Sequence, residues 1–384
     1  MTVLAGDLRL NTYKRWPVEF SRGEGSRLFD DKGRAYIDLV AGIAVMSVGH
    51  SHPRVVQAIA RQAQELIHVS NLYDTVPQQR LARRLGELSD GMSSFFCNSG
   101  AESIECAMKL ARKWGDGRSR IIAAHGSFHG RTFGALAATG QPAKRAPFEP
   151  NLPGITHVPY GDADSLRGAI DQDVCAVLLE PIQGEAGVVV PPDGYLMAAR
   201  RICDEAGALL ILDEVQTGLG RTGRWFAHLH EGVAPDVMCL AKALASGLPI
   251  GACLAAPHVA GAFVPGDHAS TFGGGPVVCA AALATLDVLD DENLVERSDR
   301  VGAAARERLT EMVEDRARVR GRGLLVGIEI GGGRARAVAE AAFERGVLVN
   351  DATPDVVRIC PPLNIAQEEL DSALDIVGES IDEV

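Results

Sequence analysis

The sequence predicts an α/β fold, with a large central domain on a mostly parallel sheet and a smaller α+β domain. In the middle of the chain, short apolar runs alternate with helical patterns, which is typical of parallel strands joined by helical crossovers. Near the two ends this alternation gives way to hairpin-like strands and charged helices. The length of 384 residues also favours two domains, because it exceeds one ordinary hydrophobic core.

The N-terminal part carries a strand–turn–strand pattern. Residues 26–30 and 35–39 read as strands, and the Asp-Lys-Gly-Arg sequence of residues 31–34 reads as the turn between them. We expect residues 1–50 to contribute to the small domain.

The large domain is expected over residues 51–285. Its candidate strands are nearly continuously apolar, as strands buried on both faces of a parallel sheet are. They span residues 94–97, 120–124, 155–158, 175–180, 209–213 and 237–241, and helical patterns at 101–114 and 196–206 lie between some of them.

The last part of the chain, residues 286–384, is expected to complete the small domain. A charged helical pattern begins at Glu296. It is followed by a strand at 324–330, a helix at 336–345, short strands at 347–349 and 356–360, and a final helix at 367–377.

Composition excludes several classes of protein. With 38 basic and 50 acidic residues the net charge is −12, which excludes a nucleic-acid binder that relies on a basic face. No run approaches the roughly 18 apolar residues of a membrane span, and the N-terminus lacks a signal-peptide core. The eight cysteines form no C-x-x-C pair, so no metal site is indicated and free, buried thiols in a cytoplasmic protein are expected.

Two polar residues end central strands and are the first candidates for chemistry. Lys242 is one of only six lysines and follows the apolar run 237–241, while Asp213 ends the run 209–213. Ligand crevices of open α/β sheets lie at the carboxyl ends of the strands, so both side chains are expected in one crevice. A lysine among apolar residues has a lowered pKa, which favours Schiff-base chemistry.

Two segments resemble nucleotide-binding motifs. Asp213-Glu214 after an apolar strand resembles a Walker B strand, but no lysine stands in a G-x-x-x-x-G-K-[ST] phosphate loop. Residues 218–223 match G-x-G-x-x-G, yet they lie several residues past the strand and lead into no helical pattern. We interpret this segment as a tight loop. An acidic residue that merely caps a strand end remains the structural alternative for Asp213.

A phosphate site is indicated where Asn98-Ser-Gly-Ala-Glu102 opens a helix. Free backbone N–H groups at a helix N-terminus bind phosphate, and Gly100 would permit close approach. An ordinary N-cap by Ser99 explains the same pattern. Phe128, in the loop after strand 120–124, could stack on a flat ring or simply pack. Together with Lys242 and Asp213, these features fit pyridoxal 5'-phosphate, which has an aldehyde, a pyridine nitrogen, a phosphate and a flat ring.

The motifs resemble those of class III pyridoxal-phosphate aminotransferases, and among them the acetylornithine aminotransferases, nearly end to end. The most specific strings are Glu180-Pro-Ile-Gln-Gly-Glu185 and Asp213-Glu-Val-Gln216. Supporting strings begin at Arg22, Leu39, Gly49, Asn98, Ser127, Ala241, Ser270 and Arg320. The resemblance implies the fold type I architecture of pyridoxal-phosphate-dependent transferases.

The resemblance also implies roles for individual residues. Lys242 would bind the cofactor covalently and carry the proton, and Asp213 would keep the ring nitrogen protonated. Gln216 would touch the ring hydroxyl, and Phe128 would stack on the ring. Cofactor contacts are further expected from Ser99, Gly100, Ala101, Glu214 and Val215.

Substrate and partner contacts follow from the same resemblance. Arg131 would clamp the substrate α-carboxylate, with Ser270 near the substrate. Thr271 would reach the phosphate of the partner subunit's cofactor, which implies a homodimer with shared active sites. Glu185 would pair with Arg358 while the donor is bound and release it for 2-oxoglutarate.

The implied reaction transfers the terminal amino group between N-acetylornithine and 2-oxoglutarate through the aminated cofactor. Ornithine, 4-aminobutyrate and succinylornithine aminotransferases remain alternatives, as does a related mutase. Departures from the family pattern include Met46 where a polar residue is expected, and they bear on substrate preference rather than on cofactor chemistry.

Overall fold

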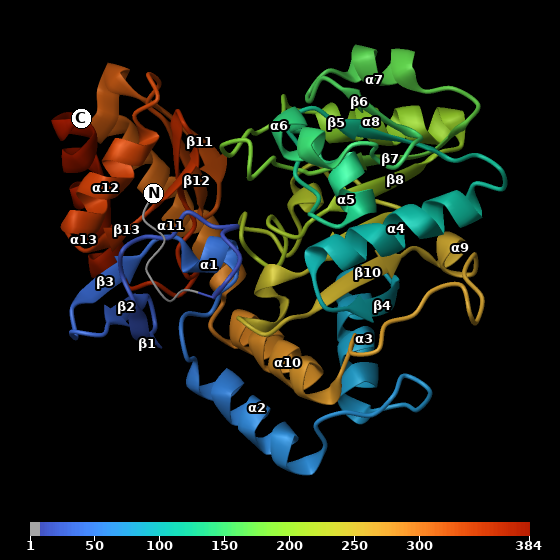
Figure 1. Cartoon of the computed structure of the whole chain (residues 1–384), viewed down its shortest axis with the longest axis horizontal. Helices are drawn as coiled ribbons and strands as arrows, with labels where there is room; N and C mark the ends of the chain where they lie inside the picture. Colours follow the sequence, from blue (N-terminus) through green and yellow to red (C-terminus); the bar gives the residue numbers. More distant parts are fainter. Residues whose placement is uncertain (1–7) are drawn as a thin grey trace.

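The computed structural model describes residues 8–384, which form two lobes (Figure 1). The larger lobe contains a seven-stranded sheet in the order β4-β10-β9-β8-β7-β5-β6. The strands are β4 (Ser93–Cys97), β5 (Arg120–Ala124), β6 (Ile155–Val158), β7 (Val174–Leu179), β8 (Leu209–Asp213), β9 (Val237–Leu240) and β10 (Gly251–Ala255). All six predicted strands are present within one or two residues.

The predicted mostly parallel sheet is confirmed, with one strand that the sequence analysis missed. β10 pairs antiparallel with both β4 and β9, whereas β5 to β9 pair in parallel. Gly251–Ala255 consists mostly of small residues, so its apolar signal is weak. Because β10 runs in the opposite direction, its N-terminal end lies at the edge where the other strands end.

Side chains alternate between the two faces of this sheet, and both faces are covered by helices. Leu209 and Ile211 of β8 pack in one cluster with α4 (Gly100–Trp114), whereas Leu210 and Leu212 pack with α8 (Tyr195–Ala206). The remaining helices of the larger lobe and its edges are α2 (Pro53–Glu65), α3 (Val76–Leu88), α5 (Phe133–Ala138), α6 (Pro142–Arg145), α7 (Ala163–Ala169), α9 (Pro257–Ala260) and α10 (Pro276–Asp291).

The smaller lobe joins both ends of the chain, as Figure 1 shows by its blue and red segments. One sheet has the order β1-β2-β3-β13 and pairs Ile37 with Val347 in parallel. A second, antiparallel sheet has the order β11-β12-β15-β14. The strands are β1 (Phe20–Glu24), β2 (Arg27–Asp30), β3 (Ala35–Asp38), β11 (Arg318–Arg322), β12 (Leu325–Glu329), β13 (Val347–Leu348), β14 (Asn350–Thr353) and β15 (Val356–Ile359).

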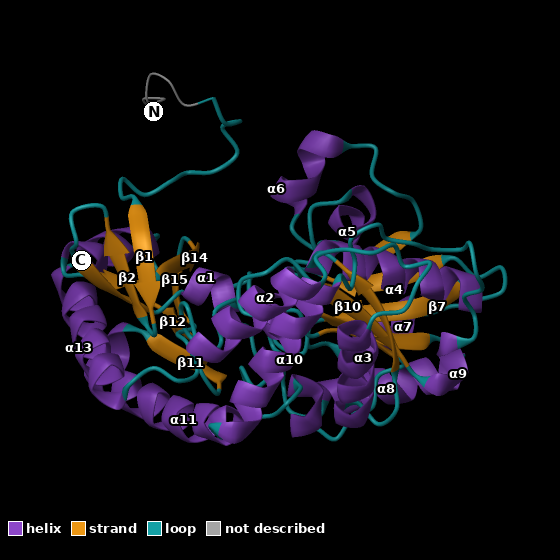
Figure 2. Ribbon diagram, turned by 90° about the horizontal axis from the view of Figure 1, so that it is seen from below, coloured by secondary structure: helices purple, strands orange, loops and turns teal. Residues whose placement is uncertain are grey.

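Long helices pack against these sheets in the smaller lobe (Figure 2). They are α11 (Leu294–Val313), α12 (Ala335–Glu344) and α13 (Gln367–Glu383), with the short α1 (Ala41–Ala44) near the junction. The expected domain boundary between residues 285 and 286 falls inside α10, which continues to Asp291. The strands β1, β11 and β14 were not predicted, because polar side chains dominate them.

All eight cysteines are buried and free, as expected from the sequence. Within residues 8–384, no helix is both long and apolar enough to cross a bilayer.

Candidate active site

A cavity of about 480 Å³ lies at the carboxyl ends of the central strands. Five strands deliver residues to it, because β4 leads to Asn98, β5 to Phe128, β7 to Glu180, β8 ends at Asp213 and β9 leads to Lys242. This is the crevice that the parallel topology predicts.

Lys242 stands in this cavity on a strained backbone. Its φ of 42° is in the left-handed region, which a non-glycine residue adopts only when its surroundings hold it there. Burial lowers the pKa of Lys242, while Glu185 and Asp213 oppose that shift by their charge. Among residues 8–384 its amine has no hydrogen-bond partner, so it is available to a ligand.

Asp213 is 5% exposed and is held by two groups. Its Oδ1 accepts a hydrogen bond from Val215 N at 3.0 Å, and its Oδ2 lies 2.8 Å from His129 Nδ1. Since a carboxylate cannot donate, Nδ1–H of His129 is the donor. The hydrogen bond from His129 holds the Asp213 carboxylate in its orientation toward the cavity.

The start of α4 (Gly100–Trp114) lies at the cavity and offers free backbone N–H groups. Ser99 Oγ accepts a hydrogen bond from Glu102 N at 3.2 Å, so Ser99 is also an N-cap. The N–H groups of Gly100 and Ala101 have no carbonyl partner in the described part of the chain. A Cβ at Gly100 would lie 2.9 Å from Val215 Cγ1, so glycine is required there. These groups fit a phosphate.

Phe128 lines the same cavity, where its ring is available for stacking. Its backbone N–H donates to Glu180 Oε2 at 3.0 Å. Burial and the nearby charge of Asp213 raise the pKa of Glu180 well above its ordinary value. Glu180 and Asp213 thus place two carboxyl groups at the same cavity.

A third group of residues connects the cavity to the smaller lobe. Arg358 on β15 is fully buried and donates to Glu185 Oε1 at 2.6 Å and to Gln216 Oε1 at 3.1 Å. Burial alone would raise the pKa of Glu185, but Arg358 and Lys242 lower it. Asn350 and the Gly184 carbonyl accept further hydrogen bonds from Arg358. The expected Glu185–Arg358 pair is therefore formed in this structure.

Not every expected site residue lies in the cavity. Glu214 faces away from it, toward the backbone N–H groups of Ala227 and His228, and so its side chain does not make the expected cofactor contact. Ser270 is bonded to Gly273 N and Asn98, and Thr271 is exposed, so neither lines the cavity of its own subunit. Arg131, Ser99, Gly100, Ala101, Val215 and Gln216 do line it.

Sequence reasoning missed His129 and Glu180. Both lie inside motifs that were recognised, but neither was assigned a role. For Glu180 a signal existed, because it is an acidic residue at the end of an apolar strand, like Asp213. For His129 the local sequence carried no such signal, since its partner is 84 residues away.

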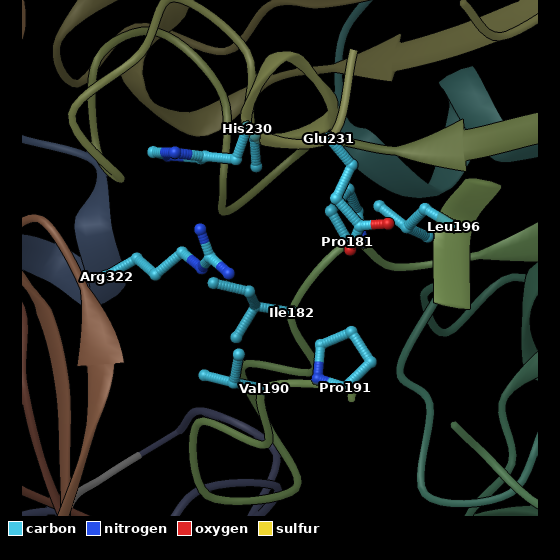
Figure 3. Close-up of a pocket in the computed structure, with 9 residues that line it drawn as sticks. Pro181, Ile182, Val190, Pro191, Leu196, His230, Glu231 and Arg322 are labelled. Atoms are coloured by element: carbon cyan, nitrogen blue, oxygen red, sulfur yellow. The ribbon is translucent and has the colours of Figure 1, made fainter. Parts of the chain in front are cut away.

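A second hollow near the lobe junction is too small for a substrate (Figure 3). Its volume of about 10 Å³ holds roughly one water molecule. His230 and Arg322 border it together with apolar residues. Within residues 8–384, no group of three or more His, Cys, Asp or Glu side chains is arranged to hold a metal ion.

The aminotransferase class III family model matches residues 10–381. The chain belongs to this family, whose members are pyridoxal-phosphate-dependent aminotransferases, and the fold type I architecture is confirmed with it. The residues of the cavity fit this cofactor, since they offer an amine, a carboxylate, an aromatic ring and free N–H groups.

Relatives with a similar sequence extend over almost the whole chain. An acetylornithine aminotransferase from Methanopyrus kandleri is 52% identical, covering 97% of this chain and 96% of its own. One from Mycobacterium tuberculosis is 53% identical, covering 94% of this chain and 91% of its own.

Solved structures agree with this membership. An ornithine aminotransferase from Toxoplasma gondii superimposes with a TM-score of 0.96 at 36% identity, covering 98% of this chain and 92% of its own. Its crystals are described as having partial occupancy of the cofactor at the active site. The acetylornithine aminotransferase of Elizabethkingia anophelis gives 0.87 at 34% identity, covering 97% and 96%.

Proposed function

We propose that this enzyme transfers the terminal amino group of N-acetylornithine to 2-oxoglutarate, reversibly, as a step of arginine biosynthesis. The observation that carries the donor assignment is the 52% identity, over 97% of the chain, to a relative named acetylornithine aminotransferase. The cavity supports amino transfer as such, because Lys242 and Asp213 face one space that also holds an anion cradle.

The chain's own residues divide the work of this reaction. When bound, pyridoxal phosphate supplies an aldehyde for the amine and a ring that accepts electrons. Lys242, with its lowered pKa, moves the proton at the reacting carbon. Asp213, which is oriented by His129, would hold the proton on the ring nitrogen, and Gln216 would contact the ring hydroxyl. The N–H groups of Gly100 and Ala101 would hold the phosphate.

One pocket must accept a donor that reacts at a terminal amine and an acceptor that reacts beside a carboxylate. Arg131 lines the cavity and grips the carboxylate at the non-reacting end of either substrate. Glu185 neutralises Arg358 while the donor is bound and leaves it free for the second carboxylate of 2-oxoglutarate. The Glu185 side chain is 22% exposed and therefore has room to move away from Arg358.

Ornithine is the second candidate donor, and the TM-score of 0.96 to an ornithine aminotransferase favours it. The same chemistry at Lys242 serves either donor. 4-Aminobutyrate and succinylornithine remain further alternatives from the resemblance, without an observation in the structure that favours them.

The absorbance spectrum of the purified enzyme tests the proposed function. N-acetylornithine, added without an oxo acid, is expected to convert the yellow form to the colourless aminated form. Conversion by ornithine or 4-aminobutyrate but not by N-acetylornithine would keep the chemistry and refute the donor. A protein that never becomes yellow with added pyridoxal phosphate would refute the assignment as a whole.

We also propose a cytoplasmic homodimer in which each subunit completes the other's active site. Exposed apolar side chains near Thr271 support the dimer, since a monomer rarely leaves such a group uncovered. They are Leu66, Ile67, Leu72, Tyr73, Val76 and Phe272. The free buried cysteines support a reducing compartment.

Sedimentation at several concentrations, with and without cofactor, tests the dimer. Thr271→Val is expected to leave the dimer intact and to weaken cofactor retention, because the hydroxyl of each subunit would contact the partner's phosphate. Ser21→Val, an exposed change on β1, serves as the control. A monomer, or full cofactor retention in Thr271→Val, would refute the shared site.

A further inference from the structure

Lys144 lies beside the active-site cavity without lining it. It belongs to the short helix α6, between Pro142 and Arg145. Its Nζ is 4.8 Å from the centroid of the Phe128 ring, and Arg131 Cζ is 5.6 Å from the same centroid. Two cations therefore stand at one aromatic ring that lines the cavity.

Neither of these cations is neutralised by a carboxylate. In the part of the chain that the structure describes, the side chains of Lys144 and Arg131 form no ion pair and no hydrogen bond. Lys113, by contrast, is paired with Asp267 at 2.6 Å. Lys144 is also half-buried, so its charge is less screened by water than that of a fully exposed lysine.

The charges around Lys144 belong to the active site itself. Burial lowers the pKa of Lys144, and Arg131 and Arg358 lower it further by repulsion. Glu185 and Glu180 oppose the shift. Lys144 therefore interacts electrostatically with residues of the active site, although it belongs to a different segment of the chain.

We propose that Arg131, which lines the cavity, and Lys144, beside the Phe128 ring, together make one end of the substrate pocket doubly positive, and that this end selects donors whose α-nitrogen carries no charge. An N-acylated ornithine presents a carboxylate and a neutral amide at this end. Free ornithine presents the same carboxylate next to an ammonium, which two fixed cations repel. The carboxylate at the non-reacting end of 2-oxoglutarate gains from both cations.

This inference rests on the proposed function, because it assumes that Arg131 holds the non-reacting end of the substrate. It adds a determinant of specificity that acts mainly against the wrong donor. Lys144 contacts neither the reacting carbon nor the amine that is transferred, so the chemical step is not expected to depend on it.

The test compares kcat/KM for N-acetylornithine with kcat/KM for ornithine in the holoenzyme. Lys144→Met removes the charge and retains most of the side-chain volume, and Lys144→Gln is a second neutral variant. Lys144→Arg keeps the charge. Lys32→Met removes an exposed lysine from the β2–β3 turn and serves as the control.

We expect the preference for N-acetylornithine to fall about tenfold in Lys144→Met and Lys144→Gln, the order of magnitude that one partly screened charge confers. The KM for 2-oxoglutarate should rise, while Lys144→Arg and Lys32→Met keep the wild-type values. In the wild type, added salt should also reduce the preference, which tests the charge without a variant.

The outcomes separate the two proposals. If the wild type prefers N-acetylornithine, but neither the neutral variants nor salt changes the preference, the role of Lys144 is wrong and the proposed function stands. If the wild type prefers ornithine, both are wrong, since a doubly positive end should disfavour an α-ammonium.

Discussion

Replacing Glu214 by glutamine is expected to destabilise the fold while sparing the chemistry. The carboxylate of Glu214 is buried and accepts four hydrogen bonds. Oε1 accepts from His228 N at 2.9 Å and lies 3.0 Å from His228 Nδ1, and Oε2 accepts from Ala227 N at 3.0 Å and from the Thr217 hydroxyl. These bonds attach the segment after the 218–223 loop to the end of β8.

The magnitude follows from these four bonds. A carboxamide offers one acceptor oxygen, and its NH2 group must face one of the two donor pairs. If the NH2 group takes the place of Oε2, the Thr217 hydroxyl can rotate and accept a hydrogen bond from it. The N–H of Ala227 then has no acceptor, which costs about 1–3 kcal/mol. The other bonds lose their charge, at roughly 1 kcal/mol. We expect a total loss of about 2–4 kcal/mol in the free energy of unfolding.

The assay is urea unfolding at pH 7 at matched protein concentration, with saturating pyridoxal phosphate for the activity measurements. Glu311→Gln on the exposed face of α11 is the control, with no expected change. A loss below about 1 kcal/mol, or a loss of activity at unchanged stability, would refute the structural role and return Glu214 to the cofactor site.

The pH dependence of the same variant has a definite sign. Burial alone would raise the pKa of Glu214, but the hydrogen bond and charge of His228, with Thr217 and Ala227, lower it below 4.5. The carboxylate therefore contributes its stability above pH 4.5, and the contribution is lost as pH falls through the lowered pKa. The gap between wild type and Glu214→Gln should narrow in that acidic range and stay constant above it.

Three further substitutions probe the cavity. Lys242→Ala should leave a folded protein without a yellow form or turnover, and measurable turnover would contradict the role of the amine. Asp213→Asn should bind cofactor but lose roughly 10²–10³-fold in kcat, because the ring nitrogen loses its charged partner; a normal rate would exclude that role. Gly184→Ala would place a Cβ 2.0 Å from Gln216 Oε1 and so displace Gln216 together with Arg358. This displacement should lower kcat/KM about 10–100-fold with little effect on folding. An unchanged kcat/KM would disprove the role of these two side chains.

The sequence was sufficient to predict the main sheet and the position of the cavity. Strands buried on both faces show continuous apolar runs, and parallel strands must end at the same edge. Lys242 and Asp213 could therefore be assigned to one crevice without any long-range information. The antiparallel β10 was not predicted, because its small residues lack the β-branched and aromatic signal of a strand.

The direction in which individual side chains point was harder to predict from the sequence. Asp213 and Glu214 are neighbours in the chain and were assigned to the same site. Successive side chains at the end of an extended strand point to opposite sides, so one faces the cavity and the other faces His228. For this reason the side chain of Glu214 does not line the cavity.

Local features could be read from the sequence: the alternation of strands and helices, the polar residues at strand ends, and the motifs that identify the family. Contacts between distant residues could not, because they form only when the chain folds. Arg358 contacts Glu185 across 173 residues, and His129 contacts Asp213 across 84. Lys144 and Arg131 reach one ring from two segments. Periodicity reports the burial of each residue, whereas these contacts depend on how whole elements pack, and only the folded chain contains that information.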